Sequence, residues 1–388
     1  MKAYFVRILF QHLAFGFTIP ISAIFMVSRG LSLTEIALIN AVLLGVSFAS
    51  EIPTGYISDR FGRKNSIALS SFVIAISMGL FAASHGFGLF LIAAVIEGVG
   101  FSLLSGSDDA FVYDTLKEKR QEAEYKKTYG KISIIDELAT LLGMLASSAI
   151  VYFGSMTAAF VVTSLLLLVT ALYTLVVLRE PTAHDEKHEN IIQSFEKSPA
   201  TIVQKAWNFL RKNNELLVAM IAFSFLSETG RFLWQPKMEE AGIGIAFFGI
   251  FFAIIKLFAI LGGYVVIKQN HKTNVYHIFI VSLIGTICFL LASLSSVIFV
   301  IGGIALYSFV ESLYRACKSD YLNERASTKL RATILSTNAM FASIGGVLFS
   351  VALGTVADNF TLTYAFVGIA VIQLIGGMII LSNKRFNS

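Results

Sequence analysis

Acidic and basic residues interrupt the long apolar stretches of this sequence, where a side chain that changes its charge can do chemistry. A carboxyl group taken out of water binds a proton more readily, and an ionisable group at membrane depth usually serves a function. The residues of this kind in the first half of the chain are Glu51, Glu97, Asp108, Asp109, Asp136 and Glu137, and those in the second half are Glu228, Arg231, Lys256, Glu311 and Arg315.

Four acids of the first half are candidates for carrying a proton. Asp136 lies one helical turn before Thr140, on what we expect to be a cavity face. Asp108 follows Glu97 by eleven residues, about three turns, so both lie on one face of a helix. The alternative for Asp108 is a position in the wet end of its helix. Glu51 belongs either with these acids or with the loop that follows it.

The ionisable residues of the second half include two pairs at helical spacing. Glu228 and Arg231 are three residues apart, and Glu311 and Arg315 are four apart, so each pair can meet on one helix face. Both structural ion pairs and a role in substrate binding remain open. Lys256 has no acid nearby in its own stretch, so it either neutralises an acid of another helix or binds an anionic group.

Further cavity residues are predicted from polar spacing in the first apolar stretch. Gln11, Phe15 and Thr18 share a stripe, and a polar stripe on a spanning helix faces the bundle rather than lipid. In the second half, Phe232 is expected to form part of an apolar cavity wall.

Two bases lie near the start of that first stretch. Arg7 is close enough to its end to extend its charged head to water. His12 is a candidate proton relay. We therefore expect the buried acids of the first half to have no base at matching depth.

The elements that position these residues are transmembrane helices. The chain has 388 residues, of which 56% are hydrophobic and 14% charged, and its mean hydropathy is +0.74. Soluble domains hold about 25% charged residues. A spanning helix takes about 20 mostly apolar residues, so the length accommodates about twelve helices with short loops. The predicted fold class is an all-α membrane protein.

The apolar stretches place these helices in two pseudo-symmetric bundles of six. The N-terminal bundle takes residues 1–179, a polar linker 180–213, and the C-terminal bundle 214–388. A weak repeat supports the two halves, since Gly55-Tyr56-Ile57 matches Gly263-Tyr264-Val265. The predicted helices lie near 4–28, 35–58, 66–84, 88–113, 131–153, 157–179, 214–235, 244–267, 275–293, 297–318, 331–355 and 362–383.

Basic residues predict the orientation, because cytoplasmic loops are enriched in Lys and Arg. One set of alternate loops is basic, and it shares its side with both termini, so both termini are expected in the cytoplasm of a bacterium whose inner membrane the chain crosses. Because these residues are spread over loops between apolar stretches, the net charge of +5 does not indicate nucleic-acid binding.

No enzyme or cofactor signature stands out. Cys288 and Cys317 fall in apolar stretches, which favours neither a disulfide framework nor a metal cluster. A Gly-rich phosphate loop does not occur, so ATP is not the expected energy source. We therefore predict no cofactor, no metal and no enzymatic activity.

The loop between the second and third predicted helices carries a specific motif. It reads Gly55-Tyr56-Ile57-Ser58-Asp59-Arg60-Phe61-Gly62-Arg63-Lys64. This resembles the signature loop of the major facilitator superfamily: glycine, three residues, Asp-Arg, one residue, Gly-Arg-Lys. The resemblance covers essentially the whole chain. It implies a secondary transporter that works by alternating access, with its cavity between the two halves.

Each position of this loop has a physical use. Gly62 permits a tight turn, and Gly55 permits close approach of another helix. In the family, the residue at Asp59 bonds the N-terminus of helix 11, which here begins near Arg331. Arg63 can pair with Asp114. Such contacts form when the halves close on the cytoplasmic side, so they bias one of two states.

Two further segments resemble a bacterial subset of drug and metabolite exporters. They are Glu51-Ile52-Pro53-Thr54-Gly55 and the run from Ser105 to Asp114. Two departures concern proton coupling. Helix 4 has Glu97-Gly98 where many proton-coupled members have an arginine-led motif, and helix 5 has no Gly-Pro pair.

The expected function is proton-coupled efflux of a small amphipathic compound such as a drug. Among the ionisable residues named at the outset, eight acids face three bases, and a negative cavity concentrates cations, so a cationic or neutral substrate is favoured. The alternatives are nutrient uptake, export of a metabolite such as a siderophore, and a membrane sensor or intramembrane enzyme that transports nothing. Expected partners are the substrate, protons and the bilayer, and we expect a monomer.

Overall fold

The structure is a computed structural model that describes residues 1–181, 214–225, 230–268, 275–325 and 331–382. These residues form helices and connecting turns, with no strand among them. Ten of the described helices are long and apolar enough to cross a membrane, or eleven if one bent pair is counted as a span. The remaining predicted span, near 214–235, includes residues 226–229, which lie outside the described part.

The chain divides into two compact units. The first comprises Met1–Leu31, Leu38–Ser194 and Gly244–Ala253, and the second comprises Ser32–Ala37, Phe195–Ile243 and Ile254–Ser388. The bundle boundaries at residues 179 and 214 stay a prediction.

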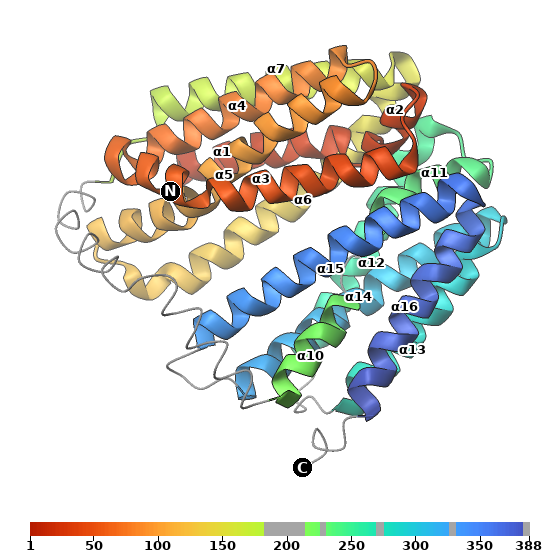
Figure 1. Ribbon diagram of the computed structural model, residues 1–388. Helices are drawn as coiled ribbons and strands as arrows, with labels where there is room; N and C mark the ends of the chain where they lie inside the picture. The colour runs from red at the N-terminus through yellow and green to blue at the C-terminus, as the bar shows by residue number, and fades with distance from the viewer. Residues whose placement is uncertain (182–213, 226–229, 269–274, 326–330, 383–388) are drawn as a thin grey trace. The chain divides into compact units, whose positions relative to one another are not determined.

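The N-terminal unit is built around α1 and α4. α4 packs against α5 and α7, and α1 packs against α6 and α7. Figure 1 shows these helices side by side in the colours from red to yellow-green. The bounds are α1 Lys2–Thr18, α2 Ser22–Ser28, α3 Leu33–Phe61, α4 Arg63–Ala83, α5 Phe87–Glu118, η1 Glu122–Glu124, α6 Tyr125–Phe153 and α7 Met156–Val177.

Small and hydroxyl-bearing residues allow these helices to approach closely, as membrane helices do when lipid offers no hydrophobic drive to associate. At the α1–α6 crossing, a Cβ on Gly16 would lie 2.5 Å from the Thr140 carbonyl oxygen, and one on Gly143 would lie 2.4 Å from that of Leu13. Along the α4–α5 contact, serine hydroxyls donate to backbone carbonyl oxygens of α5, in the pairs Ser66 to Leu103, Ser70 to Gly100 and Ser77 to Ala93.

The C-terminal unit is organised around α13, which packs against both α14 and α16, while α10 packs against α15 and α16. Phe223 forms edge contacts with Tyr314 and Tyr321 in its core. The bounds are α10 Asn214–Phe225, η3 Arg231–Leu233, α11 Trp234–Glu240, η4 Ile245–Phe247, α12 Phe248–Lys268, α13 Val275–Ser293, α14 Val297–Arg325, α15 Arg331–Asn359 and α16 Leu362–Ser382.

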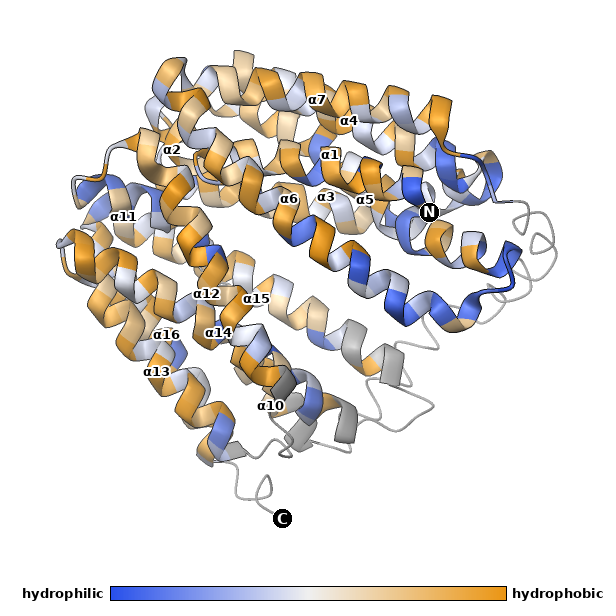
Figure 2. Cartoon of the chain, turned by 180° about the vertical axis from the view of Figure 1, so that it is seen from behind, coloured by the Kyte–Doolittle hydropathy of each residue, from blue (hydrophilic) through white to orange (hydrophobic). Residues whose placement is uncertain are grey.

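Large apolar side chains lie on the outside of each unit. Phe153 and Val176 are exposed on α6 and α7. Figure 2 shows hydrophobic colouring along α4, α7, α13 and α16, with hydrophilic colouring gathered toward the N-terminal end of α6. This pattern fits helices whose solvent is lipid along their middles and water at their ends.

Helix ends differ from the predictions where polar residues continue a helix beyond its apolar part. α6 begins at Tyr125 rather than near 131, and α14 continues to Arg325 rather than ending near 318. The predicted first helix is two helices, α1 and α2, bent by 41°. Apolar content locates the part of a helix inside the bilayer and is silent about its extension into water.

Candidate functional site

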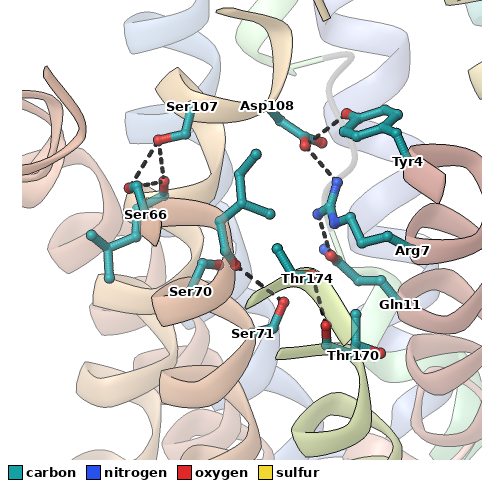
Figure 3. A network of polar contacts seen from close by, with 12 residues as sticks. Tyr4, Arg7, Gln11, Ser66, Ser70, Ser71, Ser107, Asp108, Thr170 and Thr174 are labelled. Atoms are coloured by element: carbon teal, nitrogen blue, oxygen red, sulfur yellow. Dashed lines mark hydrogen bonds and ion pairs between the residues drawn. The ribbon is translucent and has the colours of Figure 1, made fainter. Parts of the chain in front are cut away.

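Arg7 and Asp108 form an ion pair inside the N-terminal unit. Arg7 Nη1 on α1 lies 2.5 Å from Asp108 Oδ1 on α5, and the Tyr4 hydroxyl donates to the same oxygen at 2.7 Å. The Arg7 side chain is 0% exposed and that of Asp108 is 24% exposed. Figure 3 shows the Tyr4 and Arg7 side chains converging on the Asp108 carboxylate. The expectation that Arg7 extends its head to water is therefore wrong, as is the expectation that the acids of this half lack a base at their depth.

Gln11, which belongs to the predicted polar stripe of α1, is hydrogen-bonded to this pair. The Arg7 guanidinium also donates to the Gln11 amide oxygen, and Gln11 is 1% exposed. Thr18 is buried as well, and its hydroxyl donates to the Phe15 carbonyl oxygen at 3.3 Å. Only Phe15 of the stripe is partly exposed. Gln11 and Thr18 thus face the interior of the bundle, as a polar stripe on a spanning helix is expected to do. Gln11 supplies an acceptor that the buried guanidinium needs, and the role of the stripe in a cavity stays a prediction.

One helical turn and a half further along α1, His12 pairs with Asp136 of α6. His12 Nδ1 lies 2.5 Å from Asp136 Oδ1, and the two side chains are 24% and 37% exposed. The Thr140 hydroxyl, one turn after Asp136, donates to the same carboxylate oxygen at 3.2 Å. Imidazole is the side chain whose charge ordinarily changes between pH 5 and 8. The pair is therefore an acid and a base in direct contact, each of them partly exposed.

Two other predicted proton carriers lie on the long helices α3 and α5. Glu97 is half-buried on α5, and because that helix is continuous from Phe87 to Glu118 the eleven-residue spacing keeps Glu97 and Asp108 on one face. Glu51 is exposed on α3. Neither Glu97 nor Glu51 forms an ion pair with another residue of the described ranges.

The signature loop forms a compact polar cluster. Gly62 has a φ of +93°, the left-handed region that favours glycine, as the predicted turn requires. The Arg63 guanidinium contacts Asp59 at 2.8 Å and Asp114 at 3.9 Å, which is the predicted Arg63–Asp114 pairing. It also donates to the Ser58 hydroxyl at 2.9 Å. One arginine therefore joins the end of α3 to α5.

The outer members of the loop are less enclosed. Arg60 is exposed beside Phe61. A Cβ at Gly55 would meet nothing within 4 Å, so the close helix approach expected there is not present among the described residues. The predicted contact of Asp59 with the N-terminus of helix 11 stays a prediction.

Glu180, which sequence reasoning missed, holds this loop from the end of α7. Its two carboxylate oxygens accept the backbone N–H groups of Arg63 at 2.5 Å and Lys64 at 2.8 Å. These are unpaired donors of the first turn of α4, where the helix dipole also favours an anion. The only sequence signal was an acid just after an apolar stretch and before Pro181, which does not say which helix it meets.

In the C-terminal unit, Glu311 is buried between two arginines. Its carboxylate lies 2.6 Å from Arg231 of η3 and 2.9 Å from Arg315 one turn along α14. Both guanidinium groups are exposed, and Arg231 also lies over the Trp234 ring at 5.4 Å. The predicted Glu311–Arg315 pair is present. The partner predicted for Arg231, Glu228, lies outside the described residues.

Two other predicted residues of this unit are half-buried. Phe232 is in η3, beside Arg231, and Lys256 is on α12. Their roles in a cavity stay predictions.

Comparison with known proteins assigns the family. A sequence model of the Major Facilitator Superfamily matches residues 5–350. In Bacillus subtilis (strain 168), the "Uncharacterized MFS-type transporter YxaM" is 24% identical over 94% of this chain and 90% of its own length. From the same organism, the "Putative niacin/nicotinamide transporter NiaP" is 25% identical over 85% and 82%. "Multidrug resistance protein 2" is 22% identical over 94% and 90%.

The fold agrees with that family. The solved structure of the nucleoside transporter NupG has a TM-score of 0.81 to this chain, at 14% identity over 98% of both chains. Members of the family are membrane transporters of small molecules and not enzymes. The chain belongs to the major facilitator superfamily and is a multi-pass membrane transporter.

Proposed function

We propose that this transporter couples the efflux of a small amphipathic compound, cationic or neutral, to the entry of protons. The observation that carries the proposal is the contact between His12 and Asp136 at 2.5 Å, with both side chains partly exposed. A proton carrier has to reach water and has to change its charge within the physiological pH range. Both side chains of this pair are partly exposed, and imidazole is the side chain that ordinarily changes its charge in that range.

The neighbouring acid Asp108 is less suited to the same work. Its partner is an arginine, which stays charged at every physiological pH, and that arginine is fully buried. Binding a proton at Asp108 would leave the Arg7 charge uncompensated in a medium of low dielectric constant, which is costly. We therefore place coupling at Asp136, with His12 as its relay, and give the Arg7–Asp108 pair a structural role. Glu97 is a further carrier candidate.

The conformational step of this proposal is alternating access between two states. Protonation of Asp136 breaks its charged contact with His12 and changes how α1 and α6 hold each other. The cluster of Asp59, Arg63 and Asp114 acts as a latch that favours one state, and it forms on the cytoplasmic side if the basic loops lie there. We place the chain in a bacterial inner membrane, with both termini in the cytoplasm and as a monomer.

Support for the substrate class comes from charge and from one relative. The excess of acids among the membrane-embedded ionisable residues favours a cation, and a relative of 22% identity is named a multidrug resistance protein. In this reading the protein contributes to antibiotic resistance by proton antiport. Phe15, Phe232 and Lys256 stay candidates for contact with the substrate.

The test uses everted membrane vesicles that contain the purified chain and a fluorescent pH probe. In the wild-type protein, adding cationic drugs to an acidified lumen is expected to release protons. Asp136→Asn keeps the size of the side chain and removes its charge, so it is expected to abolish that release. Glu118→Gln, which removes an exposed acid at the end of α5, is the matched control and is expected to respond as the wild type does. Proton release that persists in Asp136→Asn would show that Asp136 is not the coupling residue.

The second candidate function is proton-coupled uptake of a nutrient, which the relative named as a niacin/nicotinamide transporter favours. The two functions predict opposite directions of flux. Cells that express the chain and accumulate labelled nicotinate, while their sensitivity to drugs stays unchanged, would replace efflux with uptake. Drug resistance without accumulation of nicotinate would support efflux.

A further inference from the structure

A depression between α3 and α5 lies apart from both the His12–Asp136 pair and the ion pairs of the signature loop. Its volume is about 260 Å³. Its lining includes Glu51, Thr54 and Gly55 from α3 and Ser102, Ser105 and Gly106 from α5. Every one of these residues belongs to the N-terminal unit, so the depression is complete within it. The proton-coupling proposal places no step here.

Two buried hydroxyl groups of this depression, those of Thr54 and Ser102, offer oxygen lone pairs. The Thr54 hydroxyl donates its single proton to the Ser50 carbonyl oxygen at 2.7 Å. In the 2.8 Å contact between Thr54 and Ser102, the donor is therefore Ser102. Both protons are used inside the protein, and the remaining lone pairs of the Ser102 oxygen are left as acceptors.

Glu51 adds a negative charge to these acceptors. Its side chain is exposed and forms no ion pair with another described residue. The lone pairs of the two buried hydroxyl groups, together with a carboxylate, suit a hard cation.

The two glycines keep the depression open. A Cβ on Gly55 or on Gly106 would meet nothing within 4 Å, so a larger side chain at either position would take up space that is now free. At about 30 Å³ for each water molecule, the volume corresponds to roughly nine waters, so a small ion fits with part of its water shell. A single carboxylate balances a single positive charge, whereas a divalent ion would leave one charge uncompensated at membrane depth.

We propose that Glu51, Thr54 and Ser102 form a binding site for Na⁺ between α3 and α5. The carboxylate of Glu51 supplies the compensating charge, the hydroxyl oxygens of Thr54 and Ser102 supply neutral ligands, and water completes the shell. This inference does not depend on the proposed proton coupling, because it concerns other residues and is tested by binding rather than by transport.

The experiment measures thermal unfolding of the purified full-length chain in detergent. Each sample holds 100 mM of NaCl, LiCl, KCl, methylammonium chloride or choline chloride, so that ionic strength is constant. NaCl is expected to raise the Tm of the wild-type protein by about 3 °C or more over choline chloride, as a ligand that binds only the folded state does. Binding of ²²Na⁺, displaced by unlabelled Na⁺ but not by choline, is the second readout on the same protein.

The variants locate the site. Glu51→Gln is expected to lose both the Na⁺-dependent shift and ²²Na⁺ binding, and Ser102→Ala to weaken that binding about tenfold. Glu118→Gln removes a carboxylate at the end of α5 instead of the one on α3. It is expected to keep both the Na⁺-dependent shift and ²²Na⁺ binding. In choline chloride the three variants should unfold close to the wild-type Tm, which shows that they fold.

Three results would overturn the proposal. The first is a wild-type Tm that is equal in NaCl and choline chloride, together with no binding of ²²Na⁺. The second is a Na⁺-dependent rise in Tm that persists in Glu51→Gln. The third is a rise in Tm with methylammonium when Na⁺ has no effect on the Tm. None of these results would touch the proton-release assay on Asp136→Asn, so failure here and failure of the proposed function can be told apart.

Discussion

Two basic residues of α1, five positions apart, meet acids in opposite ways. Arg7 is fully buried against Asp108 of α5, with Tyr4 and Gln11 also bonded into the group. His12 meets Asp136 of α6 with both side chains partly exposed. The first pair joins a permanent, fully buried charge to a carboxylate that is 24% exposed. The second joins an imidazole to a carboxylate, and both side chains are partly exposed.

The difference shows how one helix can carry both a structural and a switchable ion pair. A buried pair is held because removing either partner strands a charge in low dielectric. A partly exposed pair costs little to break, since water takes over the solvation of each group. Within the N-terminal unit, the permanence of its charge and the burial of its side chain support the structural role proposed for Arg7, and partial exposure supports the coupling role proposed for His12.

The largest expected effect comes from breaking the buried pair. Arg7→Ala leaves Asp108 without its counter-charge and is expected to lower the free energy of unfolding by about 3–5 kcal/mol. The double variant Arg7→Met with Asp108→Leu, which removes both charges, should recover much of that loss. Denaturant unfolding in detergent measures both. If Arg7→Ala unfolds at the denaturant concentration of the Glu118→Gln control, the pair has no structural role.

The next effect converts the switchable pair into a permanent one. His12→Arg places a base that does not titrate beside Asp136, so the contact should resemble that of Arg7 with Asp108. We expect the protein to remain folded while substrate-driven proton release is lost, and transport activity to become independent of pH between 5 and 8. Transport in vesicles across that range is the measurement. A pH profile that matches the wild type would mean that His12 takes no part in coupling.

The smallest effect sharpens the boundary between the two pairs. Tyr4→Phe removes the hydroxyl that donates to Asp108 but leaves Arg7 in place. A hydrogen bond to a charged group contributes about 1.5–3 kcal/mol, so the unfolding free energy should fall by about that amount. The pH profile of transport should not change. A shifted profile would show that Asp108 also exchanges protons, and the contrast between the two pairs would then fail.

The amino-acid sequence alone predicts an all-α membrane protein and the positions of most of its helices. Long apolar stretches require helices in a bilayer, because a backbone without water must bond within its own segment. Gly62 indicated the turn, and the resemblance to the family implied that Arg63 meets Asp114 of α5. The contact of Arg63 with Asp59 was not predicted, because Asp59 was assigned to the N-terminus of helix 11. The Glu311–Arg315 pair was predictable because residues four apart on a helix are neighbours.

The contacts between residues far apart in the sequence are seen only in the folded structure. The sequence does not show that Arg7 lies opposite Asp108, that His12 lies opposite Asp136, or that Glu180 reaches the first turn of α4, because each contact depends on how separate helices are rotated and packed. The burial of Gln11 and the depression beside Glu51 follow from the same packing. Apolar periodicity restrains the lipid-facing side of a helix strongly and its protein-facing neighbours weakly, so partners across a bundle are set by close packing of small residues such as Gly16 and Gly143.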